Sequence, residues 1–167
     1  MAKGMEAIYS RTWTSGANGV SFNNIPQTNT DLLILVSARS SHTSFDGFGI
    51  YFNGSQSPVS NNSITGNGSS ASASKSTYRS VATMPGNDST TNAFASFQIY
   101  VPNYTSTSFK QILVEGVTEN NATAVQLVLT SHLSLSNAPI TSFMFDSATA
   151  GVNQLAQTSV SIYGISR

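Results

Sequence analysis

Apolar and polar residues alternate with a period close to two along almost the whole chain. The clearest example is VQLVLTSHLSL at 125–135, where Val or Leu occupies nearly every odd position. Alternation of this kind places successive side chains on opposite faces of a β-strand, whereas an amphipathic helix would repeat every three or four residues. The pattern therefore predicts strands with one polar face. No window predicts more than a single helical turn.

Turn residues divide this pattern into short segments. We expect ten strands, over residues 6–13, 20–25, 31–37, 48–53, 77–84, 93–101, 108–116, 124–135, 140–146 and 158–165. Asn53-Gly54 and Pro102-Asn103, for example, supply the positive φ angles or the fixed proline φ at which a chain reverses. The expected fold class is all-β, an antiparallel β-sandwich of jelly-roll type. Because 32–36 is apolar at every position, we expect a central strand covered on both faces.

The length of 167 residues predicts a single domain, 1–167, with a short N-terminal arm over about 1–6. The segment 55–76 is rich in Ser, Asn and Gly and has almost nothing to bury. Such a composition is typical of a flexible linker or of a long surface loop. Because neither flank has enough strands for its own sandwich, we interpret 55–76 as a surface loop.

Charge is scarce, and this excludes several classes of function. Seven Lys and Arg balance seven Asp and Glu, and charged residues make up 8% of the chain against about 25% in an ordinary domain. A nucleic-acid partner is not expected, because no basic stripe is present to neutralise phosphates. The longest apolar run has five residues against the roughly 20 that cross a bilayer, so no membrane partner is expected either. No apolar signal stretch lies within 1–11, which predicts folding in the cytoplasm.

Residues that could carry catalysis or hold a metal are few. The chain has no cysteine, and its two histidines, His42 and His132, are 90 positions apart without acidic residues at ligand spacing. His132 lies on the polar face of its expected strand, where we expect an exposed side chain. Glu115 and Glu119 could form a carboxylate pair, but their spacing is more simply that of two solvated charges near a strand end. We therefore expect no catalytic residue, no metal, no cofactor and no enzyme activity.

Aromatic residues at strand ends are the remaining candidates for a site. Trp13, Tyr104 and Phe109 lie where a ring either caps the core or anchors an interface. Several such rings close to amides and hydroxyls would also suit a carbohydrate. We name these three residues as the candidate interface.

Four segments resemble a recurrent signature of virion structural proteins of tailed bacteriophages. They are VSFNNIPQTNTDLLILVSARS at 20–40, FNG at 52–54 with GNGSS at 66–70, IYVPNY at 99–104 and SIYGI at 161–165. The resemblance spans nearly the whole chain. Its motifs are turn-and-strand patterns and contain no catalytic fingerprint.

The resemblance implies a non-enzymatic virion protein, most simply a capsid decoration or cement protein. Such a protein would sit on the outer capsid surface as a homotrimer, bind the major capsid protein and stabilise the head by bridging capsomers. The alternative is a carbohydrate-binding or host-recognition module of a phage tail or fibre. Fold class does not separate the two, because sandwiches of this type serve both purposes.

Overall fold

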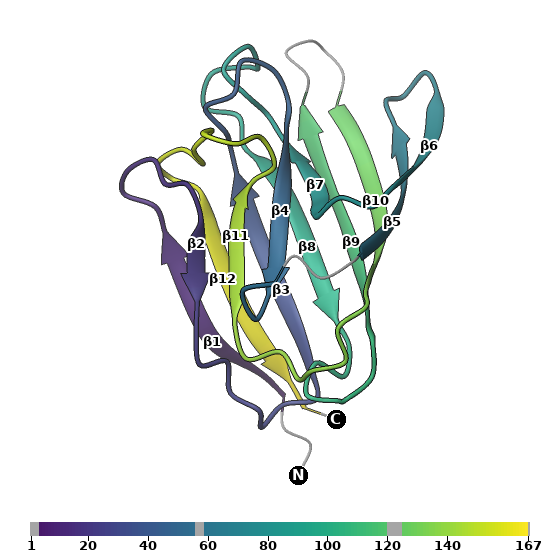
Figure 1. Ribbon diagram of the computed structural model, residues 1–167. Helices are drawn as coiled ribbons and strands as arrows, with labels where there is room; N and C mark the ends of the chain where they lie inside the picture. Colours follow the sequence, from purple (N-terminus) through teal and green to yellow (C-terminus); the bar gives the residue numbers. More distant parts are fainter. Residues whose placement is uncertain (1–3, 56–58, 120–124, 167) are drawn as a thin grey trace.

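The computed structural model describes residues 4–55, 59–119 and 125–166, which form twelve β-strands and no helix (Figure 1). The larger of two sheets has eight strands, in the order β1 (Met5–Thr12), β12 (Ser159–Ile165), β3 (Asp31–Ala38), β8 (Ala95–Val101), β9 (Lys110–Glu119), β10 (Val125–Ser134), β5 (Val59–Gly66) and β6 (Ala71–Ser76). The smaller has four, in the order β2 (Val20–Phe22), β11 (Phe143–Ser147), β4 (Asp46–Phe52) and β7 (Ser80–Met84). Every pair is antiparallel. The predicted all-β antiparallel sandwich is confirmed, whereas jelly-roll topology stays a prediction.

The larger sheet consists of two parts. Strands β1, β12, β3 and β8 interleave along the sequence with the strands of the smaller sheet. The other four come from two hairpins, β9–β10 and β5–β6, which are far apart in sequence and pair through β10 and β5. We call these four strands the extension; they lie side by side in Figure 1.

Aromatic side chains fill the space between the two sheets. The ring of Phe48 on β4 meets Phe97 on β8 edge-on, with centroids 4.9 Å apart. Phe48 also stacks on Phe145 of β11 at 5.4 Å. Leu32 and Ile34 of β3 are fully buried beside them. Removal of this apolar surface from water is the main force that holds the sheets together.

Each of the ten predicted strands overlaps an observed strand, but the interpretation of 55–76 as a surface loop is wrong. This segment supplies β5 and β6, which pair from Asn61 with Ser76 to Gly66 with Ala71. Strand β6 is exposed throughout, so its backbone pairing needs no apolar side chains, and the alternation signal is missing.

The expected N-terminal arm is shorter than 1–6, because Met5 and Glu6 already belong to β1. Residues 1–3 of the arm lie outside the described residues.

Strand β3 is central in the sheet, as predicted, but only one of its faces is covered. It pairs with β12 on one side and β8 on the other. Its outward side chains include Leu33, which is half-buried, and Leu35, which is 40% exposed. The expectation of cover on both faces is wrong because the smaller sheet packs against the inner face alone.

Candidate interaction surface

Besides Leu113, five exposed aliphatic side chains lie on the outer face of the extension, turned away from the core. Their exposed fractions run from 41% to 61%: Ile64 on β5, Val117 on β9, and Val125, Leu127 and Leu129 on β10. We call these five residues the apolar face.

Strand register makes the apolar face continuous. Leu127 lies directly opposite Val117, and Leu129 lies opposite Ile64. Side chains at opposite positions of antiparallel strands have their Cβ atoms about 5 Å apart. Contiguous exposed apolar patches are typical of interaction surfaces.

The inner face of β10 is polar in the C-terminal half of the strand. Thr130, His132 and Ser134 are each no more than 3% exposed. This is the reverse of the usual alternation in an antiparallel sheet, which turns apolar side chains inward and polar ones to water. The expectation that His132 is exposed is therefore wrong.

Hydrogen bonds hold this buried polar layer. His132 Nδ1 lies 2.5 Å from the side-chain oxygen of Asn61 on β5. The Asn61 amide in turn donates to the carbonyl oxygens of Tyr78 and Ser80, at 2.5 and 2.9 Å. Burial lowers the pKa of His132 to about 4, so its ring is neutral near pH 7. These contacts join the extension to the segment that leads into β7.

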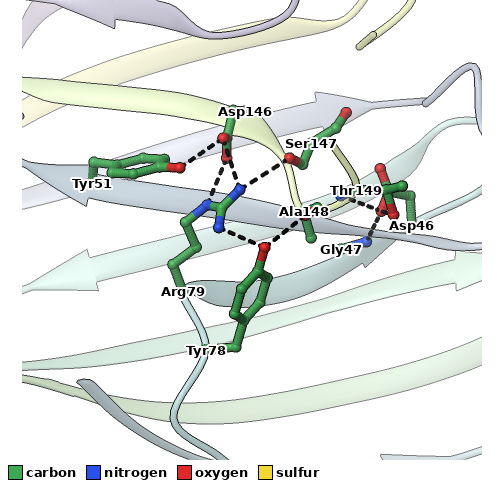
Figure 2. A network of polar contacts seen from close by, with 9 residues as sticks. All are labelled: Asp46, Gly47, Tyr51, Tyr78, Arg79, Asp146, Ser147, Ala148 and Thr149. Atoms are coloured by element: carbon green, nitrogen blue, oxygen red, sulfur yellow. Dashed lines mark hydrogen bonds and ion pairs between the residues drawn. The ribbon is translucent and has the colours of Figure 1, made fainter. Parts of the chain in front are cut away.

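A second polar network fastens the same segment to the smaller sheet (Figure 2). The Arg79 guanidinium donates to both carboxylate oxygens of Asp146 on β11, at 3.3 and 3.1 Å. It also lies over the rings of Tyr78 and Tyr51, 4.6 and 5.0 Å from their centroids. Burial, together with the hydrogen bond to Asp146, raises the pKa of Tyr51 to about 12.

Neighbouring contacts in Figure 2 extend this network along the chain. The Tyr78 hydroxyl donates to the Ala148 carbonyl at 2.8 Å. Asp46 accepts hydrogen bonds from the Gly47 amide and from the amide and hydroxyl of Thr149. Each of these polar groups contacts the protein itself, so the arrangement acts as a structural brace.

The three residues predicted as an interface lie in two different environments. Trp13 and Tyr104 are 4% and 0% exposed and belong to the core. The Tyr104 hydroxyl donates to the Pro26 carbonyl, which fixes the ring as a cap. Phe109 is 56% exposed, immediately before β9. An interface role stays a prediction, and Phe109 is the member of the three that offers its ring to a partner.

The two glutamates of β9 are not brought together. Four residues of extended strand separate Glu115 from Glu119 by about 13 Å, beyond the roughly 5–9.5 Å between paired glycosidase carboxylates. Glu115 accepts a hydrogen bond from Gln98, and Glu119 accepts two from Thr90, at 2.7 and 2.9 Å. Over the described ranges, no cluster of His, Asp and Glu could hold a metal ion, and no helix is long and apolar enough to cross a membrane.

The apolar face is the feature that sequence reasoning missed. Its signal is the alternation of 125–135, which predicts that the two faces of the strand differ but favours burial of the aliphatic one. Comparisons of the chain with protein-family models, curated proteins and solved structures found no match.

Proposed function

We propose that the chain is a non-enzymatic virion structural protein, a capsid decoration or cement protein of the tailed-bacteriophage type. It binds the outer surface of the assembled head through the apolar face and stabilises the head by bridging capsomers. It folds in the host cytoplasm before it joins the particle.

The observation that carries the proposal is the outward orientation of the apolar face. Leu127, Val125 and Ile64 are 61%, 58% and 55% exposed, while the polar side chains of Asn61, Thr130 and His132 on the same strands are buried. An apolar surface of this kind favours a protein partner, because contact removes the aliphatic side chains from water. The major capsid protein is the proposed partner.

Two further features support the proposal. The resemblance of the four sequence segments is to virion structural proteins and covers nearly the whole chain. The interleaving of β1, β12, β3 and β8 with the four strands of the smaller sheet favours the jelly-roll type within the sandwich class.

In the proposed mechanism, a trimer binds the capsid more tightly than a single subunit does. Each contact of one subunit with the capsid can be weak, because three linked contacts raise the effective concentration of the remaining ones. The near absence of net charge also limits repulsion between many copies on one surface.

The first experiment is the stoichiometry of the chain in purified particles, by quantitative mass spectrometry against the major capsid protein. A ratio of the same order as the capsid protein supports decoration. A ratio of a few per cent or less overturns it and assigns the chain to the tail or fibres. Analytical ultracentrifugation of the isolated protein tests the trimer.

A binding experiment then tests the apolar face itself. Leu127→Ser should lower the affinity for assembled capsids by about tenfold, as expected for a central interface residue. The matched control is Met5→Ser, since Met5 is 59% exposed on β1, at the opposite edge of the same sheet from the extension. Equal occupancy for the two variants would contradict the proposed docking surface.

A further inference from the structure

The outer face of the larger sheet also carries two adjoining hollows, at the end where β9 begins. Their volumes are about 500 and 430 Å³, within the range of small-molecule sites, and both are lined by Pro102 and Gln111. The first also contacts Tyr100 and Asn62, and the second contacts Phe109. Together they form one groove. None of the five residues of the apolar face lines it.

Two aromatic rings stand in this groove. Phe109 is 56% exposed. Tyr100 is half-buried, and its hydroxyl donates to an Asp31 carboxylate oxygen at 2.7 Å, which fixes the ring. Leu33 and Leu113, its cross-strand neighbours, flank it on the outer face. A ring held as that of Tyr100 is binds a flat apolar surface with little loss of conformational entropy, and the exposed ring of Phe109 offers a second such face.

Two side-chain amides complete the lining. Asn62 on β5 and Gln111 on β9 are exposed, and neither side chain hydrogen-bonds to another described residue. Each amide has a donor group and an acceptor oxygen, so it can pair with two adjacent hydroxyls at once. Ser60 and Ser131 add hydroxyl groups to the same wall.

The groove is uncharged. No Lys, Arg, Asp or Glu lines either hollow, and His132, which borders the first, is buried and neutral near pH 7. A phosphorylated or sulfated ligand would find no counter-ion here. Flat apolar faces, adjacent hydroxyls and absence of charge are together the properties of a neutral sugar chain.

We infer that this groove binds a neutral oligosaccharide. The rings of Phe109 and Tyr100 stack on sugar faces, and the amides of Gln111 and Asn62 hydrogen-bond to ring hydroxyls. Two hollows side by side fit a chain of sugars better than a single residue. The inference concerns a different part of the outer face from the proposed capsid contact and does not depend on it.

The test is an NMR titration of the isotope-labelled full chain. The probes are neutral hexasaccharides of glucose, mannose, galactose and N-acetylglucosamine, with hexagalacturonate and a proline-rich peptide for comparison. We expect at least one neutral hexasaccharide, at millimolar concentration, to shift the side-chain amide signals of Gln111 and Asn62. No shift with any neutral probe overturns the inference, as does a stronger response to the charged sugar or the peptide.

Variants connect the binding to these residues. Phe109→Ala should weaken the affinity roughly two- to tenfold, and Gln111→Ala should weaken it as well, whereas Phe109→Tyr should retain it. Because Phe109 is exposed, we expect the thermal unfolding of its variants to match the parent. Leu127→Ser is the control that should bind sugar normally. Unchanged sugar affinity in Phe109→Ala would overturn the proposed sugar site. The capsid binding of Leu127→Ser tests the proposed function alone and has no bearing on the sugar site.

Discussion

His132 on β10 and Asn61 on β5 are joined by a buried hydrogen bond of 2.5 Å beneath the apolar face. The two residues are 71 positions apart in the sequence, and their contact links the two hairpins of the extension. It also fixes which side of β10 is turned inward. Leu127 and Leu129 of that strand lie outward, while His132 has its hydrogen-bond partner inside.

Acid should therefore destabilise the protein through His132. Its pKa is about 4 in the folded state against 6.5 when solvated, so between these values the unfolded state binds more protons. This contribution to stability is fully present above pH 6.5 and is lost as the pH falls toward 4. We expect a loss of about 2–3 kcal/mol between pH 7 and pH 4.5, measured by urea unfolding.

His132→Gln is the control for this pH dependence. The variant retains a polar side chain but has no group that titrates in this window. It should lose less stability between pH 7 and pH 4.5 than the parent does. Parallel pH profiles for the two proteins would show that another group is responsible.

The brace around Arg79 should contribute measurably to folding. Arg79→Met removes the charged hydrogen bonds to Asp146, whose side chain is only 10% exposed. We expect a loss of about 2 kcal/mol in the free energy of unfolding, from denaturant titration. Arg11→Met is a suitable comparison, because Arg11 is exposed and lies over Trp13 at 5.9 Å, and its loss should be much smaller.

Gly116 on β9 should not tolerate a side chain. A Cβ atom added there would lie 2.2 Å from Cβ of Phe97 and 2.6 Å from the Ser96 carbonyl oxygen. Gly116→Ala should cost about 1–3 kcal/mol or more through overpacking, seen as a lower midpoint of thermal unfolding. Gly66→Ala meets nothing within 4 Å and should leave the midpoint nearly unchanged. Equal midpoints for the two variants would contradict the close approach of β9 to β8.

The orientation of the extension can be tested by truncation on its two faces. Ile112→Ala on the inner face of β9 should cost about 2–5 kcal/mol, because the side chain is 3% exposed. Leu127→Ala on the outer face should change the free energy of unfolding by no more than about 0.5 kcal/mol. It should also reduce the fluorescence of a dye that binds exposed apolar surface. A large loss of stability in Leu127→Ala would mean that the apolar face is buried.

Local pattern alone predicted most of the strands and turns. The two-residue turn at Asn53-Gly54 is observed, with φ angles of 53° and 72° and a hydrogen bond from the Ser55 amide to the Phe52 carbonyl. Both residue types accept positive φ, so the sequence is sufficient to place this turn. The pattern does not predict the hairpin of β5 and β6, because β6 is exposed throughout and the only large apolar residues of β5 are Val59 and Ile64, which do not alternate.

The sequence by itself determined that the chain is all-β and that 125–135 is a strand with one aliphatic and one polar side. Only the tertiary structure decided which side is buried. Periodicity specifies that two faces differ, but a shift of one residue in the pairing exchanges them, and that choice rests on contacts distant in sequence. Here the contact is the hydrogen bond of His132 with Asn61, whose amide in turn donates to the Tyr78 carbonyl. It holds the ring of His132 inward and leaves Leu127 and Leu129 outward. The same pairing of distant strands brings Asn62, Gln111 and Tyr100 to the lining of one groove, an arrangement that no segment of the sequence contains.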